Sequence, residues 1–171
     1  MHCRSQGGKT LAYVAGWQVY GTSREQAWAR SREALLEIAA HTRPLGITVA
    51  VEPTASDSNL VDDCDDLITM LAEVDCPNVK AMFDTFHTLY RSEVPTDYLH
   101  HLGRDLTHIH LADVNRKPPG SGVVDFRSLL DVLKAGGFDG YLTKEIGFNR
   151  RNVEPDDLAR RAHDYICSRL A

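Results

Sequence analysis

The stretch Ile47-Thr48-Val49-Ala50-Val51-Glu52-Pro53 decides the fold. Its β-branched run predicts a short strand, which a carboxylate and a proline then end. The residues before it have a helical pattern: Ser23 is a suitable N-cap, Gln26 follows three places later, and apolar residues recur on one face to about residue 42. An apolar stretch at residues 11–15 supplies a strand ahead of that helix. This part of the chain therefore forms a strand–helix unit that leads into a second strand.

The same alternation continues along the chain. Apolar residues follow a helical spacing from Leu60 to Leu71, with Ser58 or Asn59 as the expected N-cap and acidic residues on a solvated face. We expect five β-α units in a single domain that spans residues 1–171. The remaining strands are predicted at residues 79–83, 106–111 and 141–143, and the remaining helices at residues 95–101, 125–135 and 155–170.

Strands that alternate with helices predict an α/β protein with a parallel sheet covered by helices. Two architectures fit, a doubly wound open sheet and part of a (β/α)8 barrel. The segment after the first strand, residues 16–21, lacks the Gly-x-Gly-x-x-Gly pattern of a dinucleotide-binding sheet. A complete barrel takes about 250 residues, whereas this chain has enough for five units.

Composition narrows the class of protein. Among 171 residues, 43% are hydrophobic and 25% charged, which is typical of a globular domain. The net charge of −5 disfavours nucleic acid as a partner. No apolar run approaches the roughly 20 residues of a membrane span, and residues 1–8 lack the apolar region of a secretory signal. The scattered cysteines, which form no C-x-x-C pair, predict reduced thiols in a cytoplasmic protein; they are Cys3, Cys64, Cys76 and Cys167.

Four successive predicted strands end in residues that bind metals: Glu52, Asp84, His110 and Glu145. The carboxyl ends of parallel strands lie side by side, at the face where barrels place their active sites. Three carboxylates raise one another's pKa when they meet, and a divalent cation relieves that repulsion. This oxygen-rich set suits Mn²⁺ best, with Mg²⁺ or Co²⁺ as alternatives. The competing interpretation is that these residues only cap the helices that follow.

Two further side chains are expected on loops above this site. His87 follows three residues after Asp84, and Arg116 follows six after His110. His87 could donate to a substrate oxygen and Arg116 could clamp one, although a single loop histidine or arginine, taken alone, is more often part of the surface. His108 faces the same side of its strand as His110, which indicates a hydrogen-bonded neighbour.

Several motifs occur in an order that resembles the sugar isomerase/epimerase group of xylose-isomerase-like TIM barrels. The resemblance is closest to ketose 3-epimerases of the D-tagatose and D-allulose type and to related sugar-phosphate epimerases. It covers the last five of the family's eight strands, so the first three units would precede Met1. The motifs are Val51-Glu52-Pro53, Phe83-Asp84-Thr85-Phe86-His87, His108-Ile109-His110, Asn115-Arg116, Pro119-Gly120-Ser121-Gly122 and Lys144-Glu145.

The resemblance implies roles for the site residues. Glu52, Asp84, His110 and Glu145 would bind the metal. Glu52 and Glu145 would also remove and return the substrate proton, while His87 and Arg116 would hold substrate oxygens. The chain departs from the ketose epimerases at Ser58, where they often carry a glutamate, which argues against a strict D-tagatose or D-allulose specificity.

The sequence therefore predicts a metal-dependent isomerase or epimerase of a ketose or ketose phosphate, working through an enediolate. The expected partners are a small sugar and either a second copy of the chain or a missing N-terminal segment, with neither nucleic acid nor membrane involved. Three alternatives stay open. They are a non-catalytic or truncated barrel fragment completed by a partner chain, an endonuclease IV-like enzyme and an inosose dehydratase-like enzyme.

Overall fold

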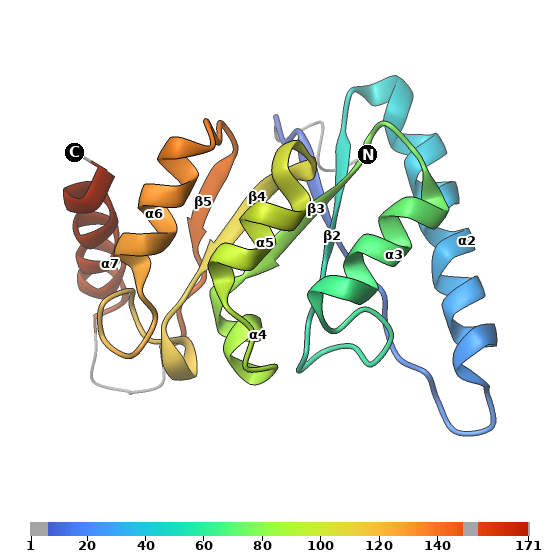
Figure 1. Cartoon of the computed structure of the whole chain (residues 1–171), viewed down its shortest axis with the longest axis horizontal. Helices are drawn as coiled ribbons and strands as arrows, with labels where there is room; N and C mark the ends of the chain where they lie inside the picture. The colour runs from blue at the N-terminus through green and yellow to red at the C-terminus, as the bar shows by residue number, and fades with distance from the viewer. Residues whose placement is uncertain (1–6, 149–153, 171) are drawn as a thin grey trace.

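A computed structural model describes residues 7–148 and 154–170. Its five strands form one parallel sheet, in which each strand pairs only with its neighbours in the sequence (Figure 1). The β2–β3 and β3–β4 registers bring the ends of the middle strands to the same edge. The strands in sheet order are β1 (Thr10–Val14), β2 (Thr48–Glu52), β3 (Val79–Asp84), β4 (Leu106–Leu111) and β5 (Tyr141–Lys144).

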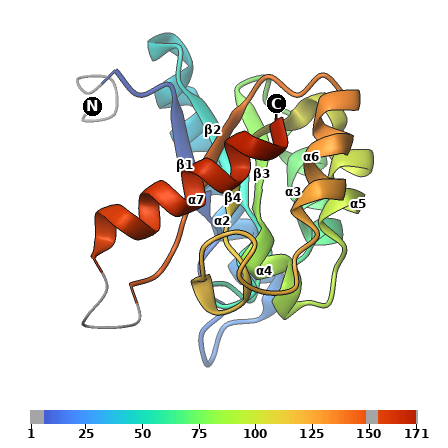
Figure 2. The same cartoon turned by 90° about the vertical axis from the view of Figure 1, so that its left-hand side faces the viewer.

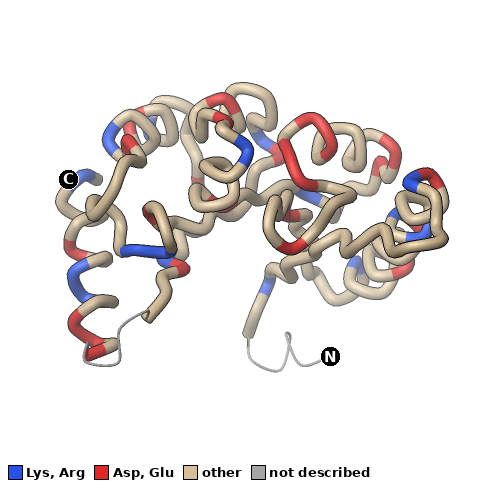
Figure 3. The backbone as a smooth tube through the Cα atoms, turned by 90° about the horizontal axis from the view of Figure 1, so that it is seen from below, with Lys and Arg blue, Asp and Glu red and all other residues tan. Residues whose placement is uncertain are grey.

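The helices cover one side of this sheet. Seen from the α7 end, the strands lie on one side and α3, α5 and α6 on the other (Figure 2). From below, the chain bends into an arch with the helices along its outer side (Figure 3), so the sheet is a half-barrel. The helices are α2 (Arg24–Thr42), α3 (Cys64–Val74), α4 (Thr85–Tyr90), α5 (Pro95–Leu102), α6 (Phe126–Ala135) and α7 (Pro155–Leu170), with short 3₁₀ turns η1 (Arg43–Leu45), η2 (Gly103–Asp105) and η3 (Val114–Arg116).

The core lies between the central strands and the helices. Residues of β2 and β3 are almost all buried, and they pack with apolar residues of α3, α5 and α6. The two outer strands differ, because Leu11, Val14 and Tyr141 keep 37%, 39% and 65% of their surface exposed. The half-barrel therefore has a complete core at its centre and open apolar surface at both edges.

The prediction for the start of α3 was wrong. The helix begins at Cys64, and Asp63 is its N-cap, accepting a hydrogen bond from the Asp66 amide at 2.9 Å. Leu60 and Val61 are buried although they precede the helix. Ser58 holds this irregular segment: its hydroxyl accepts from the amides of both residues, at 3.1 and 3.4 Å. It also donates to the Gly16 carbonyl at 2.7 Å, so Ser58 is tied to the loop after β1 and not to a helix.

The loop predicted after β3 is instead the short helix α4. The Asp84 carboxylate accepts from the Phe86 amide at 2.8 Å and so caps the first turn. His87 therefore projects from a helix, and it is buried. By contrast, the capping box of α2 is confirmed, with the Gln26 amide donating to the Ser23 hydroxyl at 3.2 Å.

Two predictions concern the N-terminus and membranes. Cys3 lies outside the described residues, and so do most of residues 1–8, for which no secretory signal was predicted. Within the described part of the chain, no helix has the length and apolar character needed to cross a bilayer.

Candidate active site

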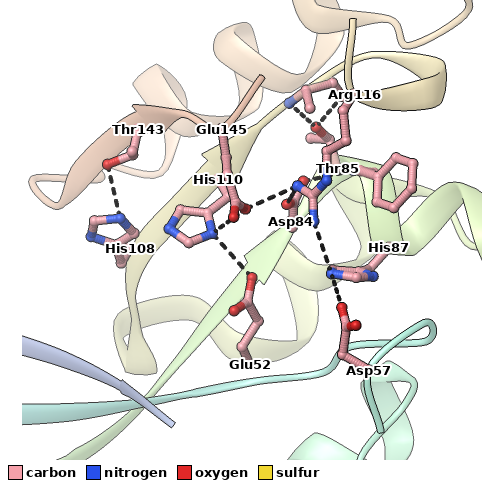
Figure 4. Close-up of polar contacts among 12 residues, drawn as sticks. Glu52, Asp57, Asp84, Thr85, His87, His108, His110, Arg116, Thr143 and Glu145 are labelled. Atoms are coloured by element: carbon pink, nitrogen blue, oxygen red, sulfur yellow. Dashed lines mark hydrogen bonds and ion pairs between the residues drawn. The ribbon is translucent and has the colours of Figure 1, made fainter. Parts of the chain in front are cut away.

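The ends of β2, β3, β4 and β5 bring four side chains together. Glu52, Asp84, His110 and Glu145 each offer one ligand atom, and these atoms all lie within 4.8 Å of one another. Strand register explains the meeting, because Asp84 is the direct partner of His110 in the β3–β4 pair. Nδ1 of His110 lies 3.1 Å from Oε1 of Glu52 and 2.9 Å from Oε2 of Glu145 (Figure 4). The structure thus brings together the four residues that the strand ends predicted.

Burial differs strongly among the four groups, and so do their pKa values. Burial opposes the charged form of His110, but hydrogen bonds to Glu145 and Glu52 raise its pKa to about 10. The same hydrogen bond from His110 is the main reason that the pKa of Glu145 falls to about 2. Asp84 is fully buried, which raises its pKa to about 7 against the opposing charge of Arg116. The low pKa of Glu145 therefore favours its ionised form, whereas the raised pKa of the buried Asp84 favours its protonated form.

Arg116 lies over this cluster from the turn η3. Its guanidinium donates to the carboxylates of Asp84 and Glu145, the latter at 2.9 Å. It also lies 4.2 Å from the centroid of the Phe86 ring, within the range of a cation–π contact. Arg116 was predicted at the mouth, and the structure places it there, in contact with two of the carboxylates.

His87 faces the same site from α4. Its Nε2 lies 3.2 Å from the Arg116 guanidinium, and its Nδ1 lies 3.4 Å from the Ser56 hydroxyl. Burial and the Arg116 charge lower its pKa, which favours the neutral ring. A neutral ring is able to donate from one nitrogen and accept at the other.

Sequence reasoning missed Ser56 and Asp57 as neighbours of the site. The Asp57 carboxylate lies 3.8 Å from Nε2 of His87 (Figure 4). Ser56 and Asp57 both lie in the loop that follows β2. Their place after a strand end was a usable signal, since barrel sites are built from such loops. Their contacts with His87 could not be predicted from the sequence, because His87 is positioned by α4 and that helix was not predicted.

His108 lies two residues before His110 on β4, on the same face of the strand. Its Nε2 lies 3.0 Å from the Thr143 hydroxyl, and its ring meets the His110 ring edge-on with centroids 5.1 Å apart. Burial, with a smaller effect of His110, lowers its pKa. The expectation that His108 neighbours His110 on the same face is confirmed.

The donor set fits a divalent cation. Three carboxylates and one imidazole offer the hard, oxygen-rich ligands that Mn²⁺ and Mg²⁺ favour, without the thiolates of a structural zinc site. A second acidic group on the surface, Asp62, Asp63 and Asp66, is different in character. Its three carboxylates pair with two arginines, Arg24 and Arg91, so protein cations already offset most of its charge.

Comparisons with known proteins agree with this geometry. The chain is 30% identical to the fructoselysine 3-epimerase of Escherichia coli O157:H7 over 149 residues, which cover 84% of this chain and 54% of that protein. It is 24% identical to the inosose dehydratase of Lacticaseibacillus casei over 172 residues, covering 88% and 53%. It also superposes on the crystal structure of D-allulose 3-epimerase from Methylomonas sp. in complex with D-allulose, with a TM-score of 0.85, 25% identity and coverage of 98% and 65%.

The chain spans about half the length of the curated relatives that it matches. A family model described as "Xylose isomerase-like TIM barrel" matches residues 2–169, which is almost the whole chain. Together with the parallel half-barrel and the cluster at its strand ends, this match shows that the chain belongs to the xylose isomerase-like TIM barrel family.

Proposed function

We propose that the complete protein is a metal-dependent isomerase or epimerase of a ketose or ketose phosphate. One observation carries the proposal: four metal-ligand side chains meet at one edge of the half-barrel, with a guanidinium and a neutral imidazole beside them. Family membership and a relative that is a sugar epimerase support it. The chain spans about half the length of the curated relatives that it matches, so the proposal concerns a longer protein in which further barrel units complete the site.

Glu52, Asp84, His110 and Glu145 are the residues that would hold the metal, and Mn²⁺ suits them best, with Mg²⁺ or Co²⁺ as alternatives. A divalent cation in this position supplies Lewis-acid stabilisation of the negative charge that develops beside a carbonyl. The buried carboxylate of Asp84 is held in place in the site by hydrogen bonds from the Phe86 amide and the Arg116 guanidinium.

Glu52 and Glu145 are proposed to transfer the proton. Glu52 ends β2 and Glu145 directly follows β5, and these strands lie three positions apart in the sheet, so a planar sugar intermediate bound between them would expose one face to each carboxylate. Removal on one face and return on the other inverts the carbon, which is epimerisation. Return on an adjacent carbon would instead exchange aldose and ketose.

Arg116 and His87 are proposed to hold the substrate oxygens. A guanidinium stays charged at neutral pH, so Arg116 is able to bind an oxygen but not to accept a proton. The lowered pKa of His87 keeps its ring neutral, so that it orients an oxygen by one hydrogen bond. Both side chains already point into the cluster (Figure 4).

Deuterium wash-in tests this proposal. The chain and a parent protein, in which the chain is joined to the β-α units that precede this region in a longer relative, are loaded with Mn²⁺. Both are incubated in D₂O with a panel of ketoses and ketose phosphates, and deuterium next to the carbonyl is measured. Glu145→Gln keeps the size of the side chain but removes the base, and loss of such a group costs about 10²–10⁴ in rate. Equal wash-in by the unmodified protein and the variant would remove Glu145 from the mechanism. No wash-in by the parent with any substrate would contradict the isomerase proposal.

Dehydration is the second candidate reaction, because the inosose dehydratase match covers 88% of the chain. It starts from the same proton removal beside a carbonyl, after which a hydroxide leaves in place of proton return. Mass spectrometry of the product distinguishes the two, since only dehydration removes one water. An endonuclease-like activity would require several metal ions per chain, so counting bound ions separates it from both.

A further inference from the structure

Asp113 is a buried carboxylate whose hydrogen bonds come from the backbone. It lies just after β4, and none of its surface is exposed. Oδ1 accepts from the amides of Val114, Val123 and Val124 at 2.9, 2.8 and 3.3 Å. Oδ2 accepts from the amide of Gly122 at 2.7 Å. Within the described residues, no Lys, Arg or His forms an ion pair with it, so peptide dipoles solvate the charge.

The loop at residues 118–124 approaches this carboxylate most closely at Gly122. A Cβ atom on Gly122 would overlap the side chain of Asp113. Only glycine therefore lets the loop backbone approach closely enough for its amides to reach the carboxylate. The loop at residues 118–124 and Asp113 are consequently held as one unit.

The same residue controls the turn that carries Arg116. Asn115 and Arg116 both have positive φ, 57° and 56°, a conformation that asparagine tolerates well but that arginine rarely adopts. The Asp113 amide donates to the Lys117 carbonyl at 2.9 Å and closes this turn, while its carboxylate holds the Val114 amide at the start. From this turn the Arg116 side chain contacts Asp84, Glu145 and His87, and the Gly147 amide also donates to the Arg116 carbonyl at 2.7 Å.

We propose that Asp113 is a positioning residue: its buried carboxylate fixes the Arg116 turn and the 118–124 loop, and so aims the guanidinium at the carboxylates of the site. It touches neither the metal ligands nor the space in front of them in any described hydrogen bond. The inference rests on the proposed function in one respect only, namely that Arg116 binds an oxygen of a sugar substrate. The geometry itself is testable in the chain without metal or substrate.

The first experiment uses the chain as it is, with isotope-labelled arginine. The Arg116 guanidinium should give an NMR signal that exchanges slowly with solvent, assigned by its absence in Arg116→Lys. Asp113→Asn places an amide NH₂ where a carboxylate oxygen now accepts, so the protected Arg116 signal should be lost. Asp125→Asn is the matched control, since this residue caps α6 in the same region through hydrogen bonds to Ser128. A protected signal in folded Asp113→Asn would overturn the proposal.

Gly122→Ala approaches the same contact from the loop side and should also abolish the protected signal. The unmodified chain gives a further check, because the amides of Gly122 and Val123 must exchange slowly if they donate to Asp113. Rapid exchange of both amides would refute the inference even if the two variants failed to fold.

A second experiment uses the enzyme activity, once deuterium wash-in into a ketose has been detected. Asp113→Asn should raise KM as Arg116→Ala does, with Mn²⁺ affinity preserved, and the double variant should be no worse than Arg116→Ala alone. Independent, additive losses would show that Asp113 does not act through Arg116. Absence of any sugar exchange would count against the proposed function, and the NMR experiment would then decide the role of Asp113 by itself.

Discussion

Asp84 shows how one side chain serves both the fold and the site. Its carboxylate caps α4 through the Phe86 amide and also pairs with Arg116, while it is fully buried. Glu145, by contrast, keeps 48% of its side chain exposed and a low pKa. Two acidic residues a few ångström apart therefore have opposite shifts in pKa because one is desolvated and the other is hydrogen-bonded to His110.

Asp84→Asn separates these two roles. Asparagine is as good an N-cap as aspartate, so α4 should form and the far-ultraviolet circular dichroism should be unchanged. Loss of the negative charge should weaken Mn²⁺ binding by at least about 10–100-fold, the range seen even for residues that only support a ligand. Titration calorimetry measures the affinity. Asp63→Asn, the same change at the N-cap of α3, is the control and should bind Mn²⁺ normally. Equal affinity in both variants would exclude Asp84 as a ligand.

The cysteines differ enough in environment to be distinguished chemically. Burial raises the pKa of the Cys64 thiol to about 12, whereas Cys167 is exposed on α7. Because the thiolate is the reactive form, iodoacetamide should label Cys167 quickly and leave Cys64 unmodified until denaturant is added. Mass spectrometry of tryptic peptides locates the label. Rapid alkylation of Cys64 in the native protein would mean that α3 is not packed as described.

At the scale of elements, α2 offers the cleanest test of a local signal. Ser23 and Gln26 form a complete capping box. Ser23→Ala should lower the free energy of unfolding by about 1 kcal/mol, the usual effect of losing such a cap. Urea denaturation measures the change, and Ser23→Asn, which retains a capping oxygen, should recover most of it. No difference between the alanine and asparagine variants would show that the cap does not contribute.

Local patterns predicted the long elements and failed at the short one. The period of α2 and the β-branched run of β2 need no tertiary information, and the structure reproduces both within a residue or two. The six residues of α4 are too few to show an apolar period. Its N-cap, Asp84, was interpreted as a metal ligand at a strand end and so gave no signal for a helix. The start of α3 was misplaced because Leu60 and Val61 share its apolar spacing but are buried through the contacts of Ser58.

The site was more predictable than its surroundings. Strand ends in a parallel sheet meet at one edge, so ligand-type residues at four strand ends could be placed from sequence alone. The supporting contacts could not. Asp57 lies near His87, and Asp113 accepts hydrogen bonds from the amides of the 118–124 loop. The partners in both contacts are set by tertiary folding. Spacing along the chain carries no signal for such contacts.

At the scale of the whole molecule, the half-barrel leaves two strand edges without a partner strand among the described residues. Closure of a barrel requires matched strand number, tilt and shear, which five strands of this sheet do not supply. Leu11, Val14 and Tyr141 add exposed apolar surface beside these edges. Such edges are sites of pairing with further chains.

We expect the chain alone to associate as its concentration rises, or to bind a hydrophobic dye as a monomer. Light scattering over a concentration series and fluorescence of the dye measure the two effects. Adding the three β-α units that precede this region in a longer relative should suppress both, since they would cover the open edges. A monodisperse monomer without dye binding would contradict the expectation.

The order of the strands has a consequence for how this protein is made. Each strand pairs only with the strands before and after it in the sequence. Pairing with a sequence neighbour closes a shorter loop than pairing with a distant strand, and a ribosome releases a chain from its N-terminus at about 5–20 residues per second. Each β-α unit can therefore dock on the previous one while the next is still being synthesised. In a closed barrel the first strand must wait for the last, and that delay is absent from the pairing seen here.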